Sequence, residues 1–85
     1  MARPDRNREV WEGWTVGALA DDLYALARMI NDGNAIKKGF KDKKDLVDWV
    51  AYEKPNIRDK KAIKEVAECL ITDVGINFKD KGMER

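Results

Sequence analysis

The sequence predicts an all-α fold, a compact domain of three helices, and three observations support this. The chain has 85 residues, and its 44% hydrophobic content with a net charge of only +1 favours folding over disorder. Three segments carry apolar residues at the 3–4-residue spacing of one helical face. A capping residue precedes each segment, and a glycine or proline follows it.

The distribution of polar residues sets the expected domain boundaries. We predict a single helical domain over residues 10–78, between a flexible polar arm at residues 1–9 and a flexible tail at residues 79–85. The sequence also allows a minor strand pair, of about residues 8–11 with residues 74–78.

The first helix is predicted over residues 16–31. Thr15 precedes it as the N-cap, because its hydroxyl can accept a hydrogen bond from an unpaired backbone N–H. Its core face carries four large aliphatic residues, Leu19, Leu23, Leu26 and Ile30. Gly33 can adopt the left-handed conformation that ends a helix.

The second helix is predicted over residues 43–53, with Asp42 as the N-cap. Its buried side consists of Leu46, Val47, Trp49 and Val50. Pro55 disfavours helical geometry at Lys54 and therefore ends the helix.

The third helix is predicted over residues 57–74, with Asn56 as the N-cap and Gly75 as the stop. Its apolar residues fall within an arc of about 140° on a helical wheel. They are Ile63, Val66, Ala67, Leu70, Ile71 and Val74.

Composition argues against enzyme chemistry. The chain contains no Ser, Gln or His, which excludes Ser–His and Cys–His nucleophile pairs and His-ligated metals. Its six glycines form no phosphate-binding loop pattern. Cys69 lies at the border of an apolar helix face and is interpreted as a small buried hydrophobe. We therefore expect no catalytic residue, no cofactor and no metal site.

Nucleic-acid binding is the alternative that the charge distribution favours. Residues 37–64 carry ten Lys and Arg against five Asp and Glu, whereas the segments on either side are net acidic. Clustered lysines can neutralise phosphates, although base recognition favours Arg, Asn and Gln. The candidate phosphate-binding residues are Lys37, Lys38, Lys41, Lys43, Lys44 and Lys61.

Protein binding is the function class that the sequence contradicts least. Three Trp in 85 residues is a high content, and Trp, Tyr and Met are enriched at protein interfaces. Ala25 and Met29 belong to a second apolar stripe on the back of the first helix. The candidate protein-binding residues are Trp11, Trp14, Met29 and Tyr52.

Two segments carry a resemblance to a class of known proteins. Trp14-Thr15-Val16-Gly17 leads into an amphipathic helix, and the run from Phe40 to Trp49 reads FKDKKDLVDW. Together they resemble small helical accessory proteins of bacteriophage and prophage genomes. The resemblance implies a compact, non-catalytic protein, an accessory or inhibitor protein that binds a host or phage protein.

Three functions thus remain as expectations. The first is a protein-binding module, whose partner is unidentified and for which a homodimer stays open. The second is a nucleic-acid-binding protein, and the third is a structural subunit of an oligomer. Residues 1–8 contain no apolar stretch and no segment is long enough to span a membrane, so we expect a cytoplasmic protein without membrane contact, in the host cell if it is phage-encoded.

Overall fold

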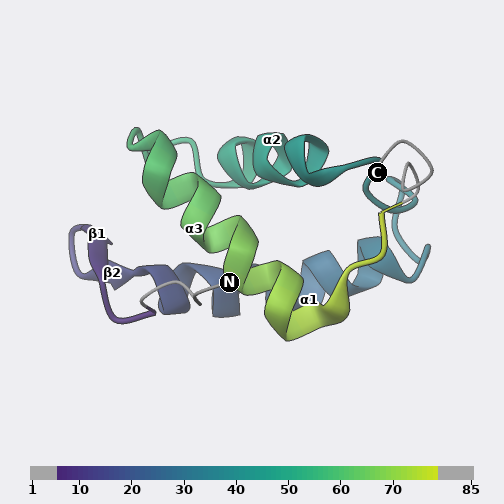
Figure 1. The fold of residues 1–85 in the computed structure, drawn as a ribbon, viewed down its shortest axis with the longest axis horizontal. Coiled ribbons are helices and arrows are strands. Elements are labelled where there is room, and N and C mark those ends of the chain that lie inside the picture. The colour runs from purple at the N-terminus through teal and green to yellow at the C-terminus, as the bar shows by residue number, and fades with distance from the viewer. Residues whose placement is uncertain (1–5, 79–85) are drawn as a thin grey trace, which may run out of the picture.

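The computed structural model describes residues 6–78, and helices make up most of them (Figure 1). In chain order, the elements are β1 (Glu9–Trp11), β2 (Trp14–Thr15), α1 (Val16–Asn31), α2 (Lys43–Glu53), α3 (Lys60–Leu70) and the π-helical turn η1 (Ile71–Gly75). The prediction of a small three-helix domain is confirmed, with a two-stranded antiparallel pair added to it. No helix within residues 6–78 is both long and apolar enough to cross a membrane.

Helices α1 and α2 have the predicted bounds and the predicted caps. The Thr15 hydroxyl accepts a hydrogen bond from the Ala18 N–H at 3.1 Å. The Asp42 carboxylate accepts one from the Asp45 N–H at 2.8 Å. The prediction for Leu26 is wrong, because this residue is 37% exposed rather than part of the core. It lines a hollow that α1 shares with α2 and with the segment between them.

Helix α3 begins later than predicted. Its N-cap is Asp59, which accepts a hydrogen bond from the Lys61 N–H at 3.0 Å, and not Asn56. Ile57 explains the difference, because its side chain is buried and its backbone N–H bonds to the Lys54 carbonyl. The chain therefore turns Ile57 into the core before the helix starts. At the other end α3 continues into η1, which ends at Gly75 with a φ of +72°.

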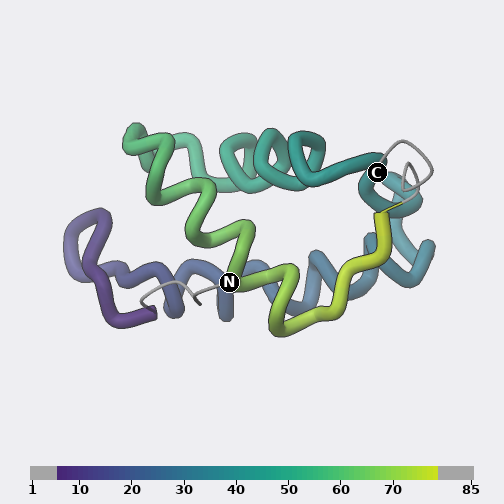
Figure 2. The backbone as a smooth tube through the Cα atoms, in the orientation of Figure 1, coloured from purple at the N-terminus to yellow at the C-terminus, as the bar shows by residue number. Residues whose placement is uncertain are grey.

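The predicted strand pair of residues 8–11 with 74–78 is wrong in its partner. Strand β1 pairs with β2, which is close in sequence, because Glu12 and Gly13 adopt φ values of 35° and 87° and reverse the chain between them. The end of the described chain instead returns to residues 32–42, the connector between α1 and α2. There Phe78 forms a parallel bridge with Phe40 (Figure 2).

The core lies where α3 packs against both α1 and α2 (Figure 1). Phe40 is fully buried and meets Trp49 edge to face, with ring centroids 5.4 Å apart. The connector is thus anchored to α2 through an aromatic pair. The other large side chains that are fully buried are Leu19, Leu46, Leu70, Val16, Val50 and Val66.

The predicted arm at residues 1–9 is described from Arg6 onward, and there it contacts the helices. The Arg6 guanidinium donates hydrogen bonds to Asp21 at 2.8 Å and to Asp73 at 2.7 Å. The backbone carbonyl of Arg6 accepts a hydrogen bond from the Gly17 N–H at 2.8 Å. A Cβ atom added to Gly17 would lie only 2.9 Å from the Cβ atom of Arg6. Glycine at position 17 therefore permits this close approach. Residues 1–5 and the predicted tail at residues 79–85 lie outside the described residues.

Candidate functional site

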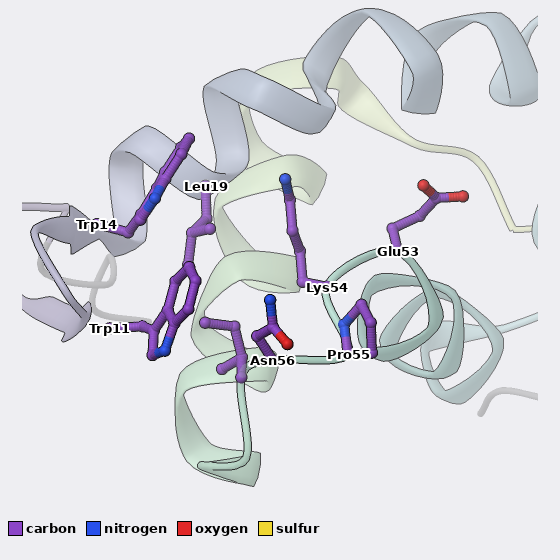
Figure 3. A pocket seen from close by; sticks show the side chains of 8 residues that line it. Trp11, Trp14, Leu19, Glu53, Lys54, Pro55 and Asn56 are labelled. Carbon is purple, nitrogen blue, oxygen red and sulfur yellow. The ribbon is translucent and has the colours of Figure 1, made fainter.

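The predicted protein-binding residues fall in two places, and the first is the β1–β2 hairpin. Trp11 and Trp14 are partners in the strand register, and both line a hollow of about 170 Å³. The loop after α2, from Lys54 to Ile57, forms its opposite wall. Figure 3 shows Lys54 between Trp14 on the hairpin and Glu53 at the end of α2.

Both tryptophans have contacts within the molecule. Trp11 is half-buried and packs against the core. Trp14 is 36% exposed, and the Lys54 ammonium lies 5.3 Å from its ring centroid in a cation–π contact. Lys54 also forms an ion pair with Asp22 of α1. The hairpin, α1 and the end of α2 are therefore joined at this hollow, which is small.

The second place is a larger hollow of about 560 Å³ beside α2, which we call the apolar groove. Its apolar lining residues are Leu26, Ile30, Ala35, Ile36, Trp49 and Tyr52. Helix α1, the connector and α2 each contribute to this lining. Ile36 is fully exposed and Tyr52 is 79% exposed, so large apolar surface rims the hollow.

Met29 belongs to the same region. It follows Leu26 by three residues on α1, which places both on neighbouring positions of one helix face. Its side chain is 47% exposed. Met29 is therefore a neighbour of Leu26 on α1, but it is not among the residues that line the apolar groove. The hollow of the two tryptophans lies at the C-terminal end of α2, the end that also carries Tyr52. Glu53 lines both hollows.

Two charged residues, Lys37 and Glu53, line the apolar groove, and the charge of Lys37 is neutralised within the molecule. Lys37 lines the groove, and its ammonium donates a hydrogen bond to the Asp45 carboxylate at 2.8 Å. Burial acts to raise the pKa of Asp45, but the bonds from Lys37 and the Lys41 backbone N–H outweigh it and lower this pKa below its ordinary value. Asp45 thus stays ionised, and it fixes the connector against α2.

Half of the six lysines of the alternative are used in ion pairs within the fold. Three of them have carboxylate partners: Lys37 pairs with Asp45, Lys43 with Glu68 and Lys44 with Asp48. The Asp48 pair raises the pKa of Lys44. The side chains of Lys38, Lys41 and Lys61 form no ion pair within the part of the chain that the structure describes. Lys37 faces the apolar groove, whereas Lys43 and Lys44 face α3.

Sequence reasoning missed two groups of residues. Leu26 and Ile36 line the apolar groove, although periodicity assigned Leu26 to the core. An isolated isoleucine in a lysine-rich connector was the available signal for Ile36. Arg58, Lys60 and Lys64 line a separate hollow between α2 and α3. Only the packing of these two helices reveals it, since the residues are ordinary solvated positions on a helical wheel.

Two observations concern the side chains that could react or bind a metal. Cys69 is buried, as predicted. Over residues 6–78, no cluster of three or more Cys, Asp or Glu side chains could hold a metal ion. What the molecule presents is an apolar groove with exposed rim residues and a separate basic surface, and both are suited to binding.

No protein-family model, curated protein or solved structure matches this chain. Its function is therefore inferred from its own residues.

Proposed function

We propose that the protein is a non-catalytic protein-binding module that docks on another protein through the apolar groove. It would act as the accessory or inhibitor proteins of bacteriophage that its sequence resembles, by covering a functional surface of the partner or by holding two partners together. The observation that carries the proposal is the exposure of Ile36 and Tyr52 at the rim of a 560 Å³ hollow.

The position of Ile36 has no structural benefit for the isolated chain. Its side chain is fully exposed, and two residues earlier the connector has the polar Asn34. Burying an isoleucine side chain contributes about 1.5–3 kcal/mol, and this contribution is realised only when a partner covers it. Tyr52 adds a second anchor of the residue type that dominates protein interfaces.

The chemistry of the groove indicates the chemistry of the partner. Lys37 is paired with Asp45, which leaves Glu53 as the one charged lining residue without an ion pair among residues 6–78. The rest of the lining is apolar. The matching surface is one with a projecting apolar side chain that inserts between Leu26 and Tyr52. Affinity at this groove should come from apolar burial and should respond weakly to salt.

Affinity capture with matched variants tests the proposal. The wild type, Ile36→Asp and Asn34→Asp are used to recover proteins from nuclease-treated lysate of the native host. Both variants add one negative charge to the connector, but only position 36 lines the groove. We expect one protein to be recovered by the wild type and by Asn34→Asp and to be lost with Ile36→Asp. Equal recovery by all three chains would contradict docking at the apolar groove.

Nucleic-acid binding has less support as a second candidate. Three of the six lysines are already paired with carboxylates, and Asp42, Asp45 and Asp48 line the same hollow as Lys41 and Lys44. It predicts DNA or RNA affinity that falls steeply with salt. A flat gel-shift titration at low salt would exclude it. Light scattering addresses the third candidate, the structural subunit, since a monomer at high concentration would contradict it.

A further inference from the structure

A second groove runs between α2 and α3, and we call it the basic groove. It consists of two adjoining hollows of about 530 and 420 Å³, which share Lys44, Val47, Asp48 and Lys64. Its cationic lining residues are Lys43, Lys44, Arg58, Lys60 and Lys64. Its aliphatic lining residues are Val47, Ala51, Ile57 and Ile63.

Most of the positive charge of the basic groove is not used within the fold. Arg58, Lys60 and Lys64 form no ion pair with any residue in the described range 6–78. Asp48 is the one carboxylate among the described lining residues, and Lys44 pairs with it at 3.0 Å. The groove therefore presents a net positive rim to solvent.

The floor of the basic groove is aliphatic. Val47 is half-buried and packs against the core, and Ile63 is buried beneath it on α3. Ala51 is exposed and has a small side chain, which leaves room above the floor between the two helices. A cationic rim around an aliphatic floor recognises a ligand that is both acidic and apolar.

We infer that the basic groove is a docking site for an acidic amphipathic helix of a partner protein. Such a helix places leucine-like side chains on Val47 and Ala51 while its carboxylates meet Lys60 and Lys64. The lining residues run from Lys43 to Ala51 of α2, so about two and a half turns of helix would fill the groove. This site goes beyond the proposed function, because it lies on the other side of α2 from the apolar groove.

Nucleic acid fits the basic groove less well than an acidic helix does. Single strands stack their bases on aromatic side chains, but the described lining residues are aliphatic. Asp48 would face the phosphates of a duplex across the groove. An acidic helix can instead set an apolar residue beside the Lys44–Asp48 pair.

The test uses a stapled helical peptide of about 15 residues, with leucine on one face and glutamate elsewhere. A second peptide carries lysine in place of glutamate, and a third carries alanine in place of leucine. Short single-stranded and duplex DNA are tested in parallel. We expect the Leu/Glu peptide to bind with a Kd of about 10–100 µM, at least tenfold more tightly than the other probes. Its NMR shift changes should centre on Val47, Ala51 and Ile63.

Two double variants with the same change in net charge separate the groove from general attraction. Lys60→Glu with Lys64→Glu alters the rim and should weaken Leu/Glu peptide binding about tenfold. Lys38→Glu with Lys61→Glu alters two exposed lysines that do not line the groove, and it should change affinity less than about twofold. Ile36→Asp should leave peptide binding unchanged.

Several outcomes would overturn the inference. Absence of peptide binding at about 1 mM would do so, as would equal weakening by the two double variants. Equal affinity of the alanine peptide would show that charge alone attracts it, and tighter DNA binding that depends on Lys60 and Lys64 would make the groove a nucleic-acid surface. Loss of binding in Ile36→Asp would move the peptide to the apolar groove. The capture experiment on Ile36 does not depend on any of these results.

Discussion

The two sides of α2 differ in which residues they expose to a partner, apolar residues on one side and cations on the other. On the side of α1 and the connector, the lysine at the groove is paired with an acid and the apolar residues are exposed. On the side of α3, the apolar floor is recessed and several cations have no acid partner among residues 6–78. One helix of 11 residues therefore borders an apolar surface and a basic surface.

This difference separates apolar burial from electrostatic attraction as contributions to binding. In the sequence, the residues responsible for the two are not separated. The lysine-rich run before and within α2 suggests one basic surface, but its acids neutralise much of it locally. Asp45, Asp48 and Glu68 each bind one of these lysines. The net positive rim arises instead at Arg58, Lys60 and Lys64, where the start of α3 meets α2. Salt should therefore affect the two grooves unequally.

The largest effect should follow removal of the side chain that anchors the connector. Phe40→Ala should lower the free energy of unfolding by about 3–5 kcal/mol, because Phe40 is fully buried and packs edge to face on Trp49. Urea denaturation measures this loss. Hydrogen exchange should show more opening of the connector than of α3, since Phe40 supports the apolar groove.

A milder variant controls for global unfolding. Phe40→Leu retains much of the side-chain volume and should cost less than Phe40→Ala. If Phe40→Leu accelerated hydrogen exchange equally in the connector and in α3, the two sides of α2 would open together. That result would contradict the view that they are independent surfaces.

The next effect concerns affinity at the apolar groove. Tyr52→Ala should weaken binding of the captured partner about 30-fold, because an aromatic anchor at an interface contributes about 2 kcal/mol or more. Its effect on the free energy of unfolding should stay within about 0.5 kcal/mol, since Tyr52 is 79% exposed. Calorimetry at low and high salt measures the affinities of the wild type and of Tyr52→Ala for the partner. A steep loss of wild-type affinity with salt would contradict an apolar mode of binding.

A smaller effect tests how Asp45 neutralises Lys37 at the apolar groove. Asp45→Asn should cost about 1 kcal/mol of stability, because it weakens the bonds from Lys37 and the Lys41 N–H at a partly exposed site. It also removes the acidic partner of Lys37, whose positive charge then remains unneutralised at the groove. Binding at this groove should then become more sensitive to salt, and an unchanged salt dependence would show that Lys37 does not reach the partner.

The contribution of the Lys37–Asp45 ion pair to stability should depend on pH. The pKa of Asp45 is lowered in the folded protein, so its contribution is fully present above the unfolded-chain pKa of about 3.9 and is lost as pH falls through the lower folded pKa. The difference in stability between wild type and Asp45→Asn should therefore shrink between about pH 6 and about pH 2. Urea midpoints over that range measure it, and a constant difference would mean that packing rather than charge stabilises the site.

The smallest effect is expected in the basic groove. Lys64→Ala should change the free energy of unfolding by less than about 0.5 kcal/mol, because Lys64 has no ion pair within residues 6–78. Lys43→Ala serves as the matched comparison, since it removes the pair with Glu68 and should cost more. A greater loss from Lys64→Ala would give this lysine a structural role and weaken the inference that it is kept for a partner.

Local signals predicted the parts of the fold that local contacts determine. Thr15 and Asp42 cap α1 and α2 through hydrogen bonds to residues three positions later, so the sequence predicts both helices with their bounds. The start of α3 depends on where the chain must bury Ile57, and that is decided by tertiary packing. The predicted pairing of residues 8–11 with residues 74–78 was wrong because a local contact was overlooked. The short turn at Gly13 brings β2 beside β1 as its partner.

The candidate surfaces were predictable only in part. Tyr52 and Met29 stood out by residue type, but the position of Ile36 at the rim depends on how Phe40 anchors the connector. The same is true of Lys60 and Lys64, whose shared groove exists only because α3 packs beside α2. A helical wheel shows which residues face solvent, but not which solvent-facing residues of two helices meet.

The guanidinium of Arg6 has a consequence for the order in which the chain folds. It bonds to Asp73, 67 positions later, and Arg8 bonds to Glu65, 57 positions later. During synthesis these carboxylates leave the ribosome long after the arginines that bind them, so the first described residues must wait for these partners. The hairpin and α1 can form early from local contacts, but the Arg6–Asp73 bond closes a loop over most of the described residues, with partners 67 positions apart. Arg6 and Arg8 are thus synthesised before their partners and form these bonds late in folding.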